Sequence, residues 1–243
     1  MKLTNFIKIT ADLTLASGLH IGAGDTEIHI GGIDNAVVKH PYNQQPYIPG
    51  SSLKGKIRSL LEWQAGVVGF SGGSPIGLSH LEKIDDPATL EHAKTIIKLF
   101  GMSSGDKISD DRLVEIGATR LAFWDCPLNE DWANERKEMG QSFTEAKSEN
   151  TIDRISGTAR NPRQTERVPA GSIFDFQLTL KVLEGDGDGL FETLLVGLKL
   201  LEYDSLGGSG SRGYGKVMFN NLKLNDEDAS GRFAAVAPFG AAA

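Results

Sequence analysis

Hydrophobic and polar residues alternate over two long segments of the chain. Every second residue from Ile7 to Leu15 is apolar, and residues 174–182 repeat this pattern after the turn signal Pro169–Gly171. Successive side chains of a strand point to opposite faces, so both segments are predicted to be strands with one buried face. Shorter apolar runs, at 119–124 and around Val217 and Phe219, predict two more strands.

Other segments carry apolar residues at the three- and four-residue spacing of a helix. This spacing predicts helices over about 51–65 and 188–202, and the first is expected to be capped by Ser51 or Ser52. A further helix is predicted around 90–100.

The order of these elements is strand, helix, strand, strand, helix, strand. This is the ferredoxin-like βαββαβ plan of an α+β protein. The core elements fall at about 5–16, 51–65, 119–124, 172–183, 188–202 and 214–224, and long insertions occupy about 17–49, 66–118 and 125–170. With no internal repeat or linker, residues 1–243 are predicted to form one domain with a loosely held tail from Gly231.

Composition narrows the class of protein. No apolar run approaches the roughly 20 residues that span a bilayer, and the single cysteine, Cys126, cannot form an internal disulfide. We therefore expect a cytoplasmic protein without a membrane partner. The net charge of −7 opposes nucleic-acid binding, but segments 48–64, 147–167 and 205–216 each carry a net charge of +2.

The first basic segment opens a predicted helix with Pro49-Gly50-Ser51-Ser52-Leu53-Lys54-Gly55-Lys56. Backbone N–H groups at a helix start favour phosphate, and Lys54 and Arg58 share one face because they are four residues apart. The string also matches GxxxxGK, but Ile57 replaces the Ser or Thr that would hold magnesium in an ATP-binding loop. A solvated basic helix face is the ordinary alternative.

A second candidate is the glycine-rich segment 207–215, which contains Arg212. Its glycines allow a ligand to approach the backbone, and Arg212 adds a forked phosphate donor. The segment follows a helix and precedes a strand, the reverse of a dinucleotide-binding fingerprint. A flexible connection would explain the glycines equally well.

Asp34 lies in a glycine-rich, mostly apolar stretch, Gly31-Gly32-Ile33-Asp34-Asn35. It could hold a divalent ion or orient a 2′-hydroxyl of RNA for attack on the next phosphate. A turn aspartate bonded to its own backbone is the commoner case. His20 is either an RNA contact or a core histidine, and the five histidines show no metal-ligand spacing.

The last candidate is the insertion around 147–167, where arginines alternate with polar residues and with Ile152 and Ile155. A projecting hairpin could press its apolar tip between bases while its arginines follow the phosphates. A plain polar loop is the alternative.

Taken in order, these motifs resemble the RAMP superfamily of CRISPR proteins. Within it, GLHIGAG, GGIDN, YIPGSSLKGKIRSLLE, ENTIDRISGTA, ERVPAGSIFDF and GGSGSRGYGKV are similar to the backbone subunits of type III-A effector complexes, the third Csm subunits. The resemblance extends from about Phe6 to Leu224.

The resemblance implies an RRM-like palm, a thumb hairpin at 147–167, and copies stacked head to tail along a guide RNA with the other subunits of the complex. It implies that Asp34 cleaves target RNA with a divalent metal, Mg²⁺ or Mn²⁺, held at Asp34. The expected RNA-binding residues are His20, Ser51, Lys54, Arg58, Gly208, Ser211, Arg212, Gly213, Arg154, Arg160 and Arg167. The alternatives are a non-catalytic RNA-binding filament subunit and a small-molecule phosphate binder.

Overall fold

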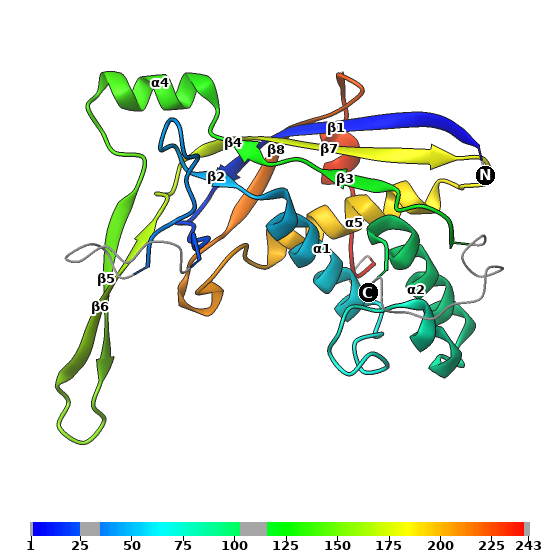
Figure 1. Cartoon of the computed structure of the whole chain (residues 1–243), viewed down its shortest axis with the longest axis horizontal. Helices are drawn as coiled ribbons and strands as arrows, with labels where there is room; N and C mark the ends of the chain where they lie inside the picture. The colour runs from blue at the N-terminus through cyan, green and yellow to red at the C-terminus, as the bar shows by residue number, and fades with distance from the viewer. Residues whose placement is uncertain (1, 25–34, 103–115, 241–243) are drawn as a thin grey trace.

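The computed structural model describes residues 2–24, 35–102 and 116–240. Its centre is a five-stranded antiparallel sheet in the order β3-β7-β1-β8-β9 (Figure 1). The strands are β1 (Leu3–Leu15), β3 (Leu121–Phe123), β7 (Ile173–Leu183), β8 (Val217–Leu224) and β9 (Glu227–Asp228). The register places Ile9 opposite Leu178 and Leu13 opposite Phe174, so the apolar residues of both long strands share one face.

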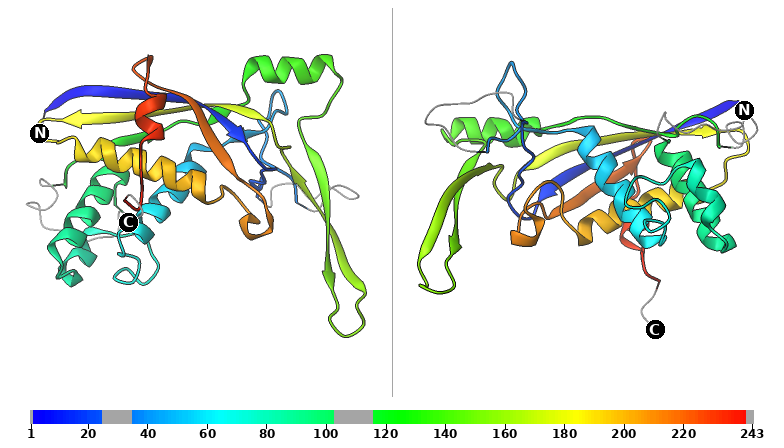
Figure 2. Two further views of the ribbon diagram at one scale, coloured as in Figure 1. Left: turned by 180° about the vertical axis from the view of Figure 1, so that it is seen from behind. Right: turned by 60° about the horizontal axis from the view of Figure 1, so that its bottom comes forward.

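Three helices cover that apolar face of the sheet. α1 (Gly50–Gln64), α2 (Pro87–Phe100) and α5 (Gly189–Tyr203) lie on the same side of it (Figures 1 and 2). α1 and α5 pack closely, because a Cβ atom on Gly197 would lie 2.7 Å from Cγ2 of Ile57. These three helices leave the other face of the sheet uncovered (Figures 1 and 2).

The predicted core is confirmed. β1, α1, β3, β7, α5 and β8 follow one another as a ferredoxin-like βαββαβ unit, with bounds within three residues of those expected. The helix in the second insertion is α2. The expected serine cap of α1 is wrong, because the helix begins one residue earlier, with Pro49 as N-cap and no side-chain cap. That residues 1–243 form a single domain stays a prediction.

The third insertion holds a hairpin and a helix. β5 (Glu145–Ile152) and β6 (Ala159–Arg167) form a two-stranded antiparallel sheet, which we call the thumb, preceded by α4 (Glu130–Glu138). The sequence did not predict α4, because its one buried residue is Ala133 and it therefore lacks an apolar stripe. Two shorter strands, β2 (Tyr47–Ile48) and β4 (Cys126–Pro127), pair beside it.

The C-terminal tail is more ordered than expected. After Ala229 the chain forms α6 (Ser230–Ala234), and Phe233 packs edge-on against Phe219 of β8. The expectation of a loose tail from Gly231 is therefore wrong for this helix, because Phe233 is buried.

Two predictions from composition can be compared with the structure. Within residues 2–24, 35–102 and 116–240, helices of the length and apolar character needed to cross a bilayer are absent. Burial raises the pKa of the Cys126 thiol to about 12, so the cysteine is an inert part of the core.

Candidate nucleic-acid interface

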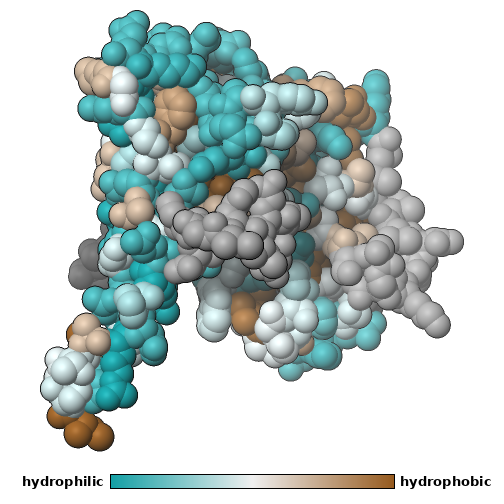
Figure 3. All heavy atoms as spheres, turned by 60° about the vertical axis from the view of Figure 1, so that its left-hand side comes forward, coloured by the Kyte–Doolittle hydropathy of each residue, from teal (hydrophilic) through white to brown (hydrophobic). Residues whose placement is uncertain are grey.

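The thumb projects from the body on the side of the sheet that carries the helices (Figure 1). Its tip is a tight turn in which Asp153 accepts hydrogen bonds from the N–H groups of Ile155 and Ser156, at 3.0 and 2.8 Å. Ile155 is completely exposed, and Figure 3 shows the apolar end of the hairpin reaching beyond its hydrophilic shaft. The hairpin predicted from the sequence is confirmed as a structure, with an unpartnered apolar tip.

The arginines of the thumb lie at two levels. Near the tip, Arg154 is exposed and Arg160 pairs loosely with Asp153 at 3.2 Å. At the base, Arg167 contacts Glu145 at 2.6 Å and lies over the ring of Tyr214, 5.2 Å from its centroid. Tyr214 belongs to the glycine-rich segment, so the base of the thumb and that segment touch.

This contact is part of a larger group, which we call the thumb-base cluster. It consists of Lys147, Glu149, Arg163, Arg167, Arg212 and Tyr214. Glu149 is its centre: it lies 3.3 Å from Arg212, 3.5 Å from Arg163 and 3.8 Å from Lys147, and it accepts a 3.0 Å hydrogen bond from the Tyr214 hydroxyl. The ammonium of Lys147 also lies 4.3 Å from the centre of the Tyr214 ring. Three cations thus surround one carboxylate, so positive charge remains to bind an anion.

The ionisation of the cluster follows from its contacts. Burial alone would raise the pKa of Glu149, but the hydrogen bond from Tyr214 and the charges of Arg212, Lys147 and Arg163 together lower that pKa below its ordinary value. Burial and the Glu149 carboxylate raise the pKa of Tyr214. At neutral pH Glu149 is therefore ionised and Tyr214 protonated, which keeps the cations spaced around a fixed centre.

The glycine-rich segment is folded against His20. Gly208 donates its N–H to the carbonyl of His20 at 2.9 Å, and a Cβ on Gly207 would lie only 2.3 Å from that oxygen. The His20 ring is held in turn, because Nδ1 lies 2.7 Å from the carbonyl oxygen of Glu166 in β6. The structure therefore brings His20, Gly208, Arg212 and Arg167 together, with Ser211 and Gly213 exposed on the same loop.

Helix α1 joins this surface through Lys56, whose ammonium lies 2.8 Å from the carboxylate of Asp204 at the end of α5, just before the glycine-rich segment. Lys54 is partly exposed and has no ion pair within the described residues. The helix start and the glycine-rich segment thus adjoin, as a shared phosphate path requires.

Arg58 departs from the prediction. Its Nε contacts Glu62 at 2.8 Å, Nη1 donates to the carbonyl of Gly101 at 3.0 Å, and Nη2 donates to that of Ile76 at 2.6 Å. The side chain is 13% exposed. These contacts argue against the expected phosphate contact, because the guanidinium already holds the second insertion onto α1. The spacing placed Lys54 and Arg58 on one helical face but could not reveal that this face is covered at Arg58.

The resemblance to an ATP-binding loop also fails. In such a protein the residues between the two glycines form a loop before the helix, whereas here Gly50 to Lys56 already belong to α1. The N–H of Gly50 is occupied as well, because it donates to Asp125 at 2.8 Å. Ser51, the other residue expected at the helix start, is exposed.

Asp34 lies outside the described residues, but the residue after it is placed. Asn35 bridges to Thr165 in β6, and its carbonyl accepts the N–H of Glu166 at 2.9 Å. Glu166 is buried and binds the same segment again, through Val37 N–H at 2.9 Å and Lys39 at 2.6 Å. The chain that follows Asp34 is thus fixed to the thumb beside His20.

Protein ligands for a metal ion are not gathered elsewhere in the described part of the chain. No group of three histidine, cysteine, aspartate or glutamate side chains there is placed to hold one.

Sequence reasoning missed several residues of this surface. Tyr214 and Glu149 stood inside quoted motifs, yet only the fold shows that they meet. Arg163 comes four residues before Arg167, so a strand places both on one face, and this spacing was an available signal. Lys147 lies on the other strand of the thumb.

Comparisons with known proteins agree with this geometry. The model of the RAMP superfamily matches residues 12–218. A protein of Streptococcus thermophilus named CRISPR system Cms endoribonuclease Csm3 is 42% identical over 89% of this chain and 88% of its own length. The chain belongs to the Csm3 family. A Csm3 protein of Methanothermobacter thermautotrophicus is 39% identical over 91% of this chain and 86% of its own.

A solved structure supports the same assignment for this Csm3-family chain. The crystal structure of a Csm3–Csm4 subcomplex in the type III-A CRISPR–Cas interference complex matches with a TM-score of 0.53 and 26% identity. The match covers 92% of this chain and 80% of that one. The ferredoxin-like core and the RAMP assignment made from the motifs are both confirmed.

Proposed function

We propose that this chain is a backbone subunit of a type III-A CRISPR interference complex, which binds guide RNA and cleaves complementary target RNA at regular intervals. One observation carries the proposal: His20, the glycine-rich segment, the base of the thumb and the chain that follows Asp34 converge on one basic surface. A phosphate chain laid across it meets forked arginine donors and the exposed glycine-rich segment.

The same convergence supports a division of labour on the RNA. Only phosphates are bound by the thumb-base cluster, Lys54 and the glycine-rich segment. Base pairing between guide and target supplies the sequence specificity. The exposed Ile155 at the thumb tip wedges between base steps, which splays a target nucleotide at each subunit. Repetition of weak contacts along one RNA then gives a stable filament of head-to-tail copies.

We assign the cleavage step to Asp34. In the sequence Asp34 comes one residue before Asn35, which is anchored on the thumb, and the thumb also carries the tip that would splay the nucleotide. A divalent ion, Mg²⁺ or Mn²⁺, would be held by Asp34 together with phosphate oxygens of the RNA, and it would stabilise negative charge at the scissile phosphate. Relatives named endoribonucleases favour this reading over an inert RNA-binding filament subunit.

The test compares Asp34→Ala with Asp226→Ala in the reconstituted complex with labelled target RNA. Asp226 is an exposed aspartate that pairs with Lys8, far from the thumb in sequence, and serves as the matched control. Asp34→Ala should retain assembly and target binding but lose cleavage, and Asp226→Ala should cleave as the parent does. Removal of divalent ions with a chelator should stop cleavage by the parent complex. Cleavage by the Asp34→Ala complex would refute the catalytic assignment.

A further inference from the structure

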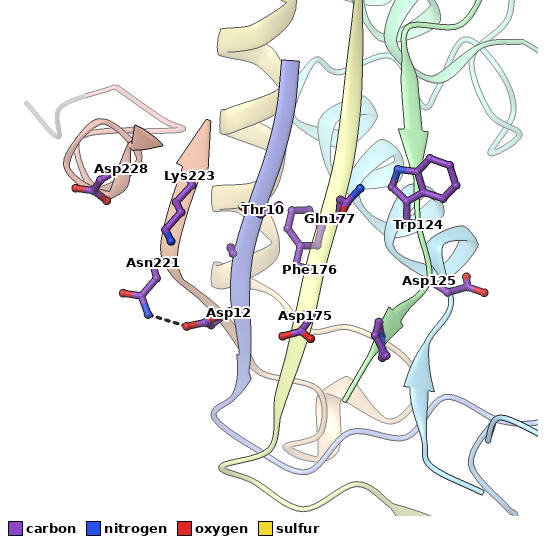
Figure 4. A pocket seen from close by; sticks show the side chains of 12 residues that line it. Thr10, Asp12, Trp124, Asp125, Asp175, Phe176, Gln177, Asn221, Lys223 and Asp228 are labelled. Carbon is purple, nitrogen blue, oxygen red and sulfur yellow. Dashed lines mark hydrogen bonds between the residues drawn. The ribbon is translucent and has the colours of Figure 1, made fainter. Parts of the chain in front are cut away.

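The open face of the sheet is hollowed opposite the helices. The hollow has a volume of about 810 Å³, and its floor is formed by outward-facing residues of β1, β7 and β8. Figure 4 shows Thr10 and Asp12 from β1, Asp175 and Gln177 from β7, and Asn221 and Lys223 from β8, with Trp124 at one rim. The indole of Trp124 is 53% exposed, although it stands at the edge of a long ordered sheet.

Two aspartates lie on neighbouring strands of this floor. Asp12 and Asp175 are direct cross-strand partners in the β1–β7 register. Like charges placed directly opposite one another destabilise a sheet, so this pair costs the free chain stability. Asparagine at either position would avoid that cost and keep the same shape.

Neutral groups are the only hydrogen-bond partners that the described chain gives these carboxylates. Asp12 accepts from the amide of Asn221 at 2.6 Å, and Asp175 accepts from the amide of Asn129 at 2.9 Å. Lys223 lines the hollow and lies opposite Asp228 in the register. Hydrogen bonds from Ser230 lower the pKa of Asp228, and the charge of Lys223 adds to this effect. The Asp12–Asp175 pair therefore faces solvent without a balancing cation in the described residues.

The chemistry of the missing partner can be narrowed. RNA is disfavoured, because its phosphates would meet two uncompensated carboxylates. A metal ion is disfavoured, since the described carboxylates do not gather into a set of three ligands. A second copy is disfavoured too, because the concentrated cations of this chain lie at the base of the thumb, which the proposed function commits to RNA. Separate cationic side chains fit, with Trp124 as a face on which a guanidinium can stack.

We propose that the open sheet face is a docking surface for a different protein subunit, which presents arginine or lysine side chains to Asp12 and Asp175 beside Trp124. This inference rests on the proposed function, because it takes the chain to be one subunit of a ribonucleoprotein. It assigns the two faces of the molecule to different partners: the basic surface beneath the sheet binds RNA, and the acidic hollow above it binds protein.

The experiment uses the complex purified from its native host, with the photo-crosslinking residue p-benzoylphenylalanine in place of Gln177 at the floor of the hollow. The matched control carries the same residue in place of Glu91, an exposed position on α2. We expect cross-links from position 177 to a lysine- or arginine-bearing peptide of another protein subunit, with none to that peptide from position 91. Cross-links to RNA, to a second copy of this chain or to no partner would overturn the proposal.

Charge removal provides the second arm. Asp12→Asn with Asp175→Asn keeps both amide hydrogen bonds, and Asp85→Asn with Glu91→Gln removes two charges from the α2 side as a control. The first pair should weaken association of the cross-linked subunit roughly tenfold at low salt, with unchanged or higher thermal stability and unchanged guide-RNA retention. Unchanged association would overturn the docking proposal, whereas loss of RNA from the parent complex would count against the proposed function instead.

Discussion

Two arginines that the sequence treats alike are separated by the structure, and their alanine variants test the reasoning most sharply. Arg58 is enclosed by Glu62 and two backbone carbonyls. The side chain of Arg212 is 51% exposed, and within the described residues its partners are Glu149 and Ser209. We therefore expect Arg58→Ala to lower stability without affecting RNA binding, and Arg212→Ala to do the reverse.

The magnitudes follow from burial. Removing one partner of a buried ion pair costs about 3–5 kcal/mol, and the exposures of Arg58 and Glu62, 13% and 8%, favour the lower end of that range. For a chain of this length a loss of about 3 kcal/mol lowers the Tm by roughly 6–12 °C. Arg58→Lys should also destabilise, because an ammonium cannot reach Glu62 and two carbonyls in the same geometry.

Arg212→Ala removes one phosphate contact from an exposed site. For single-stranded RNA the slope of log K against log salt should become shallower by about 0.7, and the affinity at low salt should fall by roughly tenfold. Its effect on stability should stay within about 1 kcal/mol, because the pair with Glu149 is half exposed.

The assays are thermal unfolding and titration of a fluorescein-labelled single-stranded RNA at several salt concentrations. Both variants and the parent are measured as the purified full chain. The interpretation of Arg58 fails if Arg58→Ala unfolds at the parent temperature and flattens the salt slope. If the slope of log K against log salt for Arg212→Ala equals that of the parent, the glycine-rich segment does not contact RNA phosphates.

Three further predictions test the fold and the thumb. Burial raises the pKa of Asp186, but its hydrogen bonds and ion pair with Arg120 lower that pKa below its ordinary value. Their pair therefore stabilises the protein above the unfolded carboxyl pKa of about 3.9, and the stabilisation is lost as pH falls further. The difference in free energy of unfolding between the parent and Asp186→Asn, measured with urea, should shrink below that pH. Ile155→Ser should leave stability unchanged but weaken binding of a guide–target duplex about tenfold in gel-shift titrations, and equal binding would exclude the tip. Gly215→Ala should lower the yield of folded protein, measured by circular dichroism, since its Cβ would lie 1.9 Å from the carbonyl oxygen of Leu206 at a φ of +74°.

Periodicity was sufficient to predict the core because every core element buries one continuous apolar face. In β1 and β7 the alternation marks the strand face that packs against the helices. In α5 the leucine spacing marks the helix face that packs against the sheet. The sequence of α4 has no such apolar pattern. The strands β2 and β4 are too short to show one, and their pairing joins residues nearly 80 positions apart.

The candidate site was predicted as separate motifs, and its assembly was not. Residue types at a helix start or in a glycine-rich loop reveal which groups can bind phosphate, but not which of them are already occupied. Arg58 shows this limit, since its acceptors Gly101 and Ile76 lie in an insertion without helical periodicity at those positions. Tyr214 shows the converse, because this residue of a predicted flexible loop is buried and donates a hydrogen bond to Glu149 at the centre of the thumb-base cluster.

The net charge of −7 opposed an RNA partner at the level of composition, and the fold removes this conflict by separating the charges in space. The cations of the thumb-base cluster lie on the side of the sheet where the thumb projects, while Asp12 and Asp175 face outward from the opposite side (Figures 1 and 4). At physiological salt, charges more than about 8 Å apart are largely screened from one another, so the acidic face does not cancel the field at the basic one. An acidic backbone subunit can therefore hold RNA on one side, and its remaining negative charge opposes nonspecific contact with nucleic acid everywhere else.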